Sequence, residues 1–168
     1  LSGDGGDELF AGYDTYIADQ MANYYDRLPG FIRNGFLPRM MNAIPPSPKK
    51  KGLINRAKRF VEGMRLPGDL HHTRWMIFLQ KLEREMLFTD DVKSGINEKD
   101  SYKFIREYFN AVMPQTTDSI NQQMYVDVKT YLVDNILVKV DRMSMATSLE
   151  ARVPFLDHRF AEFAATIS

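Results

Sequence analysis

The sequence predicts a mostly α-helical fold. Apolar residues recur at helical spacing along most of the 168 residues, and the alternation typical of strands is nearly missing. Residues 119–150 contain neither Gly nor Pro, whereas both residue types separate the other apolar runs. The chain has neither an internal repeat nor a low-complexity tract. These features indicate helices joined by turns, in a chain of about one domain's length.

The first expected helix covers residues 7–28 and stops at Pro29 and Gly30. A second apolar run, over 31–40, also has helical spacing although it contains a proline. It leads into "IPPSPKKKG", residues 44–52, whose prolines and lysines predict the clearest loop of the chain.

Helical stripes then cover residues 53–64, 70–87 and 100–113. The segment 119–150 predicts the longest helix, which we expect to end at Pro154. Phe155 and Leu156 are expected to fill the core. Asp157 is placed to cap a short terminal helix within residues 151–168.

Composition excludes several classes of protein. With 44% hydrophobic and 12% aromatic residues, the chain can bury a core. Its 22 Lys and Arg balance 22 Asp and Glu, so no net charge indicates nucleic acid or an anionic membrane as a partner. The absence of Cys excludes a disulfide framework and a cysteine nucleophile within these residues. It also fits a cytoplasmic protein, and no apolar stretch reaches the roughly 18–20 residues of a membrane span.

The opening residues 1–8, "LSGDGGDE", have the composition of a ligand loop. Three glycines let the backbone bend tightly near a ligand, and the helix that follows would turn its N–H groups towards the loop. Asp4 and Asp7 would repel a bare phosphate but can bind one through Mg²⁺. The spacing matches neither common phosphate-loop template, so Asp7 could instead cap the helix beside an ordinary turn.

The same loop carries an expectation about the rest of the fold. A Gly-rich turn before a helix is the usual ligand-facing corner of an α/β unit. We therefore expect a parallel sheet upstream of these residues, with Leu1 as the tail of one strand.

Three other features are expected to have structural roles. Asp127, Asp134 and Asp141 lie seven residues apart, which places them near one helix face, with Asp127 on the solvated side. His72 follows another histidine directly, so the two cannot form a metal pair at helical spacing, and a surface or cap role is expected. Glu150 and Arg152 are expected to form a buried or partly buried pair.

Two separated stretches carry a resemblance to a known family. "SGDGGDELFAGY", residues 2–13, and "LVKVDRMSMATSLEARVPFLDHRF", residues 137–160, resemble the synthetase domain of class B, glutamine-hydrolysing asparagine synthetases. The resemblance spans residues 1–168 in order, with a variable helical region over 30–118. It implies the helical C-terminal part of a PP-loop ATPase fold, also called adenine-nucleotide α-hydrolase-like, whose parallel sheet lies upstream.

The resemblance also implies an activity. Enzymes of this family use MgATP to activate the side-chain carboxylate of aspartate as β-aspartyl-AMP. Ammonia, delivered from glutamine by an N-terminal glutaminase domain, then displaces AMP to give asparagine. Aspartate, glutamine, ATP and Mg²⁺ are thus the implied ligands, and a homodimer is a further expectation.

Six residues receive roles from the resemblance. Ser2 and Gly3 fall where the family's loop contacts the nucleotide, and Asp7 matches the acid that helps hold magnesium and pyrophosphate. Asp4 aligns with a catalytic acidic position that is often Glu, so its shorter side chain leaves its role in formation and aminolysis of the adenylate open. Lys139 and Arg142 would face pyrophosphate, although an intrahelical salt-bridge cluster with Asp141 is the competing interpretation.

Other functions remain open at this stage. A related enzyme could adenylate a different carboxylate, as a β-lactam synthetase or a peptide-modifying amidotransferase does, or the chain could be a helical interaction module without catalysis. The family's S-G-G-x-D-S nucleotide loop is not found in these residues. We therefore expect these 168 residues alone to be inactive.

Overall fold

The computed structural model describes residues 1–45, 52–64, 70–75, 79, 81–95 and 102–167. Over these ranges the chain is helical and contains no strand, as the sequence predicts. It divides into two compact units, of which unit 1 comprises Leu1–Tyr13 and Leu79–Ser168 and unit 2 comprises Asp14–Phe78. No described helix is both long enough and apolar enough to cross a membrane.

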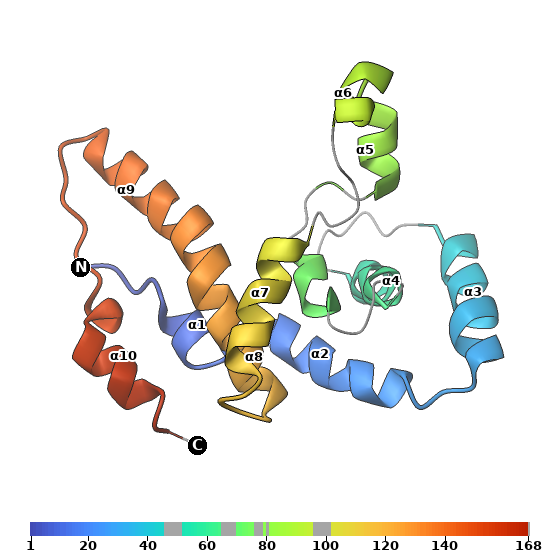
Figure 1. Ribbon diagram of the computed structural model, residues 1–168, viewed down its shortest axis with the longest axis horizontal. Coiled ribbons are helices and arrows are strands. Elements are labelled where there is room, and N and C mark those ends of the chain that lie inside the picture. Colours follow the sequence, from blue (N-terminus) through green and yellow to red (C-terminus); the bar gives the residue numbers. More distant parts are fainter. Residues whose placement is uncertain (46–51, 65–69, 76–78, 80, 96–101, 168) are drawn as a thin grey trace. The chain divides into compact units, whose positions relative to one another are not determined.

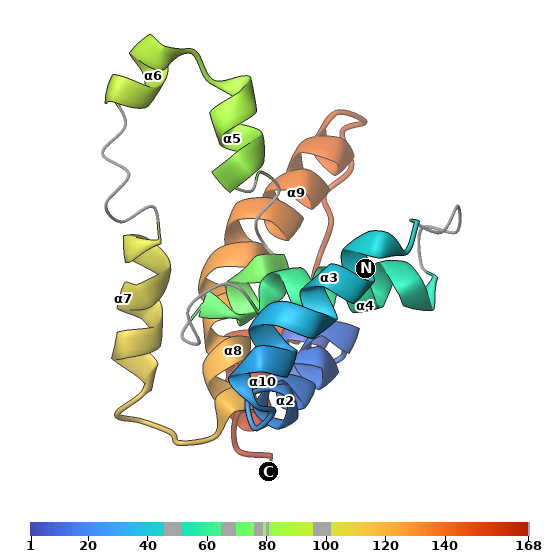
Figure 2. The same ribbon diagram turned by 90° about the vertical axis from the view of Figure 1, so that its right-hand side faces the viewer.

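Unit 1 is built around a long helical rod. Its elements are α1 (Gly6–Leu9), α5 (Lys81–Leu87), α6 (Asp90–Gly95), α7 (Lys103–Val112), α8 (Ser119–Asp127), η5 (Val128–Leu137), α9 (Val138–Met145), η6 (Pro154–Leu156) and α10 (His158–Ala164). Here α8, the π-helical η5 and α9 follow one another without a break and form the rod (Figure 1). Helix α7 packs beside α8 (Figure 2), and α1 packs against α8 and η5.

The rod ends earlier than predicted. Helix α9 stops at Met145, nine residues before Pro154, so the proline does not terminate it. Ser148 takes a left-handed conformation with φ of 57°, and the Leu149 amide turns back to the Ser144 carbonyl at 3.0 Å. This is the Schellman pattern, in which a left-handed residue closes the last turn and satisfies free carbonyls. A serine occupies the position where glycine is usual, which is why composition gave no stop signal.

The π-helical segment also divides the predicted stripe of acids. Asp127 is only 4% exposed, contrary to the expected solvated position, whereas Asp134 and Asp141 are exposed. A π-helix has more residues per turn than an α-helix, so positions on either side of η5 lose the shared face that a seven-residue spacing implies. Burial of Asp127 follows from its place at the end of α8, which packs against α1 and α7.

Two further predicted helices are present in unit 1. The described residues of the stripe over 100–113 form α7, which buries Ile105, Phe109 and Val112, and residues 100–101 lie outside the described residues. The terminal helix is confirmed as α10, with the Asp157 carboxylate accepting the Arg159 amide at 3.0 Å.

Unit 2 contains α2 (Asp14–Tyr25), η1 (Ile32–Phe36), α3 (Leu37–Ala43), α4 (Leu53–Gly63) and η3 (His72–Trp75). Helix α3 packs against η1 and α4, and α2 packs against η3. The predicted stripe over 53–64 is therefore present as α4. Of the predicted loop 44–52, residues 46–51 lie outside the described residues, as do 76–78 and 80 of the stripe over 70–87.

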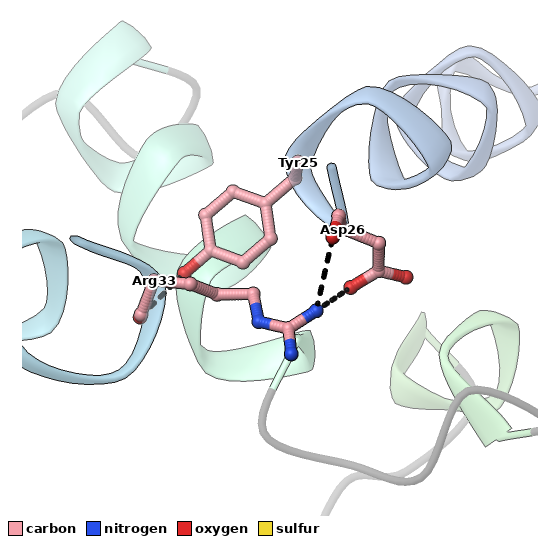
Figure 3. Close-up of polar contacts among 3 residues, drawn as sticks. All are labelled: Tyr25, Asp26 and Arg33. Atoms are coloured by element: carbon pink, nitrogen blue, oxygen red, sulfur yellow. Dashed lines mark hydrogen bonds and ion pairs between the residues drawn. The ribbon is translucent and has the colours of Figure 1, made fainter. Parts of the chain in front are cut away.

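The turn after α2 is fixed by polar contacts. Arg33 of η1 donates to the Asp26 carboxylate at 2.7 Å, and the Tyr25 hydroxyl donates to the Arg33 carbonyl at 2.9 Å (Figure 3). The Tyr25 ring also packs edge-on against Phe60 of α4, with centroids 5.6 Å apart. These contacts hold η1 and α4 to the end of α2.

A buried pair of ionisable residues lies in the same unit. Nδ1 of His72 contacts the Asp19 carboxylate, and the two side chains are 3% and 5% exposed. The His72 ring stacks on Tyr16, with centroids 5.5 Å apart and planes 13° apart. The expected surface or cap role of His72 is therefore wrong. Its position in a short 3₁₀ turn packed on α2 places it in the core instead.

The helix predicted over 7–28 is divided in two. Helix α1 ends at Leu9 and α2 begins at Asp14. Between them Ala11 is left-handed, with φ of 52°, and the Gly12 amide donates to the Asp7 carbonyl at 2.9 Å. Helical spacing continues through the break because the chain resumes the same apolar pattern after the turn, so periodicity alone did not reveal it.

Candidate functional site

The two stretches that the sequence singled out lie together in unit 1. The Ser2 amide donates to the Arg152 carbonyl at 2.8 Å, which ties the loop 1–8 to the segment before η6. A Cβ added at Gly5 would lie 2.4 Å from Leu156, and one added at Gly6 would lie 3.7 Å from Phe155. Residues separated by about 150 positions in sequence thus form one surface.

Position 5 requires glycine because of both its backbone conformation and its surroundings. Its φ of 85° is in the region that favours glycine, and the Leu156 side chain fills the space where a Cβ would project. The residue is buried and lies immediately before α1. It therefore lets the loop approach η6 closely.

Aromatic side chains support this contact from α10. Phe10, which follows α1, lies 6.3 Å from Phe155 and 6.1 Å from Phe160 between ring centroids, both edge-on. Phe155 and Phe160 are themselves 5.5 Å apart. Phe155 is nevertheless 36% exposed, so it only partly fills the core as predicted.

The first four residues present polar groups on an open backbone. The Ser2 hydroxyl donates to the Asp4 carboxylate, which fixes one side chain against the other. No heavy atom lies within 4 Å of a Cβ added at Gly3, so space is open at this position. A ligand can therefore reach the loop backbone at Gly3, beside a carboxylate held by Ser2.

Asp7 faces outward from α1. It is exposed, and within the described residues no hydrogen bond or ion pair engages its carboxylate. The residue capping α1 is Gly5, with no side-chain cap, so the capping role considered for Asp7 is wrong. Because α1 has only four residues, its dipole adds little to anion binding at the loop.

The loop's carboxylates suit magnesium that is shared with a phosphate ligand. No group of three or more His, Cys, Asp or Glu that could hold a metal occurs among the described residues. Magnesium is commonly held by one or two protein carboxylates together with substrate phosphate oxygens. An exposed and unengaged Asp7 suits that kind of site, whereas a cage made by the protein alone does not fit these residues.

Sequence reasoning missed Glu8, which is 1% exposed and directly follows Asp7. The Tyr13 hydroxyl donates to its Oε1 at 2.6 Å, and the Tyr13 ring lies edge-on to Tyr131 of η5 at 6.1 Å. Burial, and then the hydrogen bond to Glu8, raise the pKa of Tyr13 far above its usual value. The available signal was the five-residue separation of Glu8 and Tyr13, which the prediction of one continuous helix concealed.

Lys139 and Arg142 lie within one turn of α9, and both are exposed. Within the described residues neither side chain has an ion-pair partner, so the competing salt-bridge cluster with Asp141 is not present. No hydrogen bond or ion pair between described residues connects them to the loop 1–8. Both cations are therefore available to an anion.

The predicted pair of Glu150 and Arg152 forms at 2.9 Å, but its side chains are 70% and 73% exposed. The expectation of a buried pair is therefore wrong. The two residues lie in the extended segment between Ser148 and η6, which leaves their side chains in solvent while the Arg152 carbonyl accepts the Ser2 amide. A surface pair of this kind contributes little to stability.

Comparison with known proteins gives consistent results. The family model described as "Asparagine synthase" matches residues 1–168. The chain is 30% identical over 167 residues to asparagine synthetase (glutamine-hydrolyzing) 1 of Bacillus subtilis (strain 168), covering 99% of this chain and 24% of that protein. It is 29% identical over 157 residues to a putative asparagine synthetase (glutamine-hydrolyzing) of Mycobacterium bovis, covering 94% of this chain and 22% of that protein. No solved structure matches.

The chain thus spans about a quarter of the length of the curated relatives it matches. The match to the family model nevertheless runs from the first residue to the last, and it includes both stretches that meet at Ser2 and Arg152. This chain belongs to the asparagine synthase family.

Proposed function

We propose that these residues form part of the active site of an ATP-dependent amide ligase. In this proposal the complete protein activates the side-chain carboxylate of aspartate as β-aspartyl-AMP and releases pyrophosphate. Ammonia obtained from glutamine then displaces AMP and gives asparagine. Support comes from family membership and from relatives that are named glutamine-hydrolysing asparagine synthetases.

The observation that carries the proposal is the contact between the loop 1–8 and the segment around η6. The Ser2 amide bonds to the Arg152 carbonyl, and Leu156 packs over Gly5. An ordinary surface turn does not need a distant segment to complete it. A ligand site commonly does, because groups on different elements must converge on one molecule.

We assign the loop residues by what their surroundings allow. Ser2 and the open backbone of Gly3 would contact the nucleotide. Asp7, exposed and unengaged, would hold magnesium together with phosphate oxygens. The metal, when bound, would neutralise charge on the pyrophosphate that leaves.

The cations of α9 complete the assignment. Arg142 can meet pyrophosphate oxygens with two parallel N–H donors, and Lys139 can add a second positive charge. Both side chains are exposed and lack ion pairs among the described residues, so binding an anion would break no existing salt bridge.

Asp4 is the proposed catalytic residue. A carboxylate beside the reacting centre can accept the proton that ammonia loses as it attacks the adenylate. Its contact with Ser2 holds the short side chain against the loop. Asp4 is also shorter than the Glu that is often found at this position in the family. This difference favours a second candidate, an enzyme with the same adenylation chemistry that acts on a different carboxylate.

A substrate panel tests both candidates. The complete protein would be incubated with MgATP and each of several amino acids and small carboxylic acids, and pyrophosphate release measured. Release that depends on aspartate supports the asparagine synthetase assignment. Release with another acid but not aspartate overturns that assignment and keeps the adenylation chemistry. No release with any acid contradicts adenylation altogether.

We further propose that the parallel sheet, the main nucleotide loop and the glutaminase domain lie outside these 168 residues. The chain covers about a quarter of its relatives, which leaves room for all three parts. The isolated chain should then be inactive and bind ATP far more weakly than the complete protein. Micromolar ATP binding by the isolated chain, measured by calorimetry, would contradict this.

A further inference from the structure

The turn between α1 and α2 folds back onto Asp7 and Glu8. The Gly12 amide donates to the Asp7 carbonyl at 2.9 Å, and the Tyr13 hydroxyl donates to Glu8 Oε1 at 2.6 Å. Two successive residues of the turn thus bond to two successive residues of α1. Each bond joins positions five apart, which closes residues 7–13 into one compact loop.

Gly12 sets the room available to the Asp7 carboxylate. A Cβ added at Gly12 would lie 2.1 Å from Asp7 Oδ1 and 3.2 Å from its Cα. Contacts this short do not occur, so any larger residue would push the carboxylate to a new position. Gly12 does not have a positive φ, so alanine adds no left-handed strain there and acts through its contacts with Asp7.

Tyr13 sets the rotation of α1. Asp7 and Glu8 are adjacent residues of α1, about 100° apart around the helix axis, and Asp7 is exposed whereas Glu8 is only 1% exposed. A buried carboxylate needs a hydrogen-bond donor, and Tyr13 supplies one while its ring rests edge-on against Tyr131. With Glu8 bonded inside by Tyr13, the rotation of α1 leaves Asp7 on the exposed side.

We propose that Gly12 and Tyr13 are positioning residues for Asp7, with Gly12 leaving the space that its carboxylate fills and Tyr13 anchoring the adjacent Glu8. This inference rests on the proposed function, in which Asp7 holds magnesium and pyrophosphate. Neither residue touches the reacting atoms. Their effect is to present the Asp7 carboxylate in one orientation, as outer residues do around metal ligands.

The test uses the complete protein and measures binding of magnesium pyrophosphate by calorimetry, which does not require turnover. Gly12→Ala and Tyr13→Phe should each weaken binding by about 10-fold. Gly12→Ala keeps the bond between Glu8 and Tyr13, so it remains informative if Tyr13→Phe fails to fold. In both variants the magnesium concentration for half-maximal pyrophosphate release should rise more than the rate at saturating magnesium falls.

Matched controls come from unit 2. Tyr25→Phe removes a comparable tyrosine hydroxyl bond, the one to Arg33 in Figure 3, and Gly35→Ala adds a methyl group where no atom lies within 4 Å. Both should keep wild-type affinity for magnesium pyrophosphate. An equal loss in the controls would overturn the inference, because it would reveal a general effect on folding.

Asp7→Asn distinguishes failure of the positioning inference from failure of the proposed role of Asp7. If Asp7→Asn weakens binding while Gly12→Ala and Tyr13→Phe leave it unchanged, the positioning inference fails and the proposed role of Asp7 stands. If Asp7→Asn also leaves binding unchanged, the role of Asp7 fails and the inference fails with it. Weaker binding in all three variants, with both controls unchanged, supports the inference.

Discussion

The acids around α2 in unit 2 differ from the charged residues of the candidate site in unit 1. In unit 2 the acids of α2 and its following turn are engaged: Asp14 with Arg56, Asp19 with His72 and Asp26 with Arg33. In unit 1, Asp7 in the loop and Lys139 and Arg142 on α9 have no such partners among the described residues. Of the three pairs, Asp19 with His72 is buried and contributes to the fold, whereas the exposed charges of Asp7, Lys139 and Arg142 are available to a ligand.

Among the variants proposed, Asp7→Asn should cause the largest loss of activity. The substitution removes the proposed metal-binding charge, so pyrophosphate release by the complete protein should fall at least about 1,000-fold, or about 4 kcal/mol of transition-state stabilisation. The control Asp26→Asn removes a paired acid of unit 2 and should leave release near the wild-type rate. Undiminished release in Asp7→Asn would remove Asp7 from the site and erase the contrast between the units.

The buried pair of unit 2 should matter for stability instead. Asp19→Ala takes away the carboxylate that His72 contacts in the core, and breaking a buried pair in this way costs about 3 kcal/mol. The free energy of unfolding, measured by denaturant titration, should fall by that amount. Release per folded molecule should stay the same, and a specific loss of release at unchanged stability would contradict the structural role.

Arg142→Met should have an intermediate effect on catalysis. A hydrogen bond from a charged donor contributes about 2 kcal/mol, so release should fall about 30-fold. Stability should change little, because the Arg142 side chain is exposed and has no ion pair among the described residues. Thermal unfolding would be recorded beside the rate, and a large drop in the unfolding midpoint would indicate a structural role.

Ser148→Gly should stabilise the chain. Ser148 adopts φ of 57° at the end of α9, where glycine is at no steric disadvantage. Placing glycine there should raise the free energy of unfolding by about 1 kcal/mol. Gly95→Ala, in a helical position with open space around it, is a control that changes glycine content in the opposite direction. Destabilisation by Ser148→Gly would contradict the left-handed conformation.

The smallest effect concerns Asp157 at the start of α10. Hydrogen bonds from the Arg159 side chain and amide lower the pKa of Asp157 to about 2 from its ordinary 3.8. Because the pKa of Asp157 is lower in the folded chain, its ionised carboxylate stabilises the fold above about pH 4, and this stabilisation is lost as pH falls towards 2. Helical circular dichroism of wild type and Asp157→Asn should therefore converge at low pH. A constant difference between them from pH 6 to pH 2 would argue against the carboxylate cap.

The helices with one clear apolar face could be predicted from the sequence. The stripe that became α7 has Ile105, Phe109 and Val112 at helical spacing, and all three are buried. The acid of the α10 cap was equally evident, since Asp157 directly precedes the helix. In both cases the interactions that decide the structure lie within one or two turns of each other in sequence.

Breaks that depend on left-handed residues could not be predicted. Ala11 and Ser148 adopt positive φ although neither is glycine, and each ends a helix inside an apolar pattern that continues. The burial of His72 and Asp19 was hidden for a related reason, because their contact spans 53 positions. These conformations depend on tertiary packing, which the local spacing of apolar residues does not predict.

The sequence indicated the kind of candidate site but not how its segments are held together. Residue types in the loop predicted a phosphate and metal site, and the family resemblance added Lys139 and Arg142, but nothing in the spacing revealed that Leu156 would cover Gly5. Likewise, the Gly12 and Tyr13 contacts with α1 depend on the break after Leu9. Prediction of a continuous helix placed these residues on a rod instead of around Asp7.

A crystal structure of the complete protein with magnesium and a non-hydrolysable ATP analogue would test the central claim most directly. We predict that an Asp7 oxygen coordinates magnesium at about 2.0–2.1 Å and that the terminal phosphates face Arg142. The Gly12 amide should still donate to the Asp7 carbonyl, and the Tyr13 hydroxyl should still donate to Glu8. Nucleotide bound away from the loop 1–8, with Asp7 still free in solvent, would contradict the account.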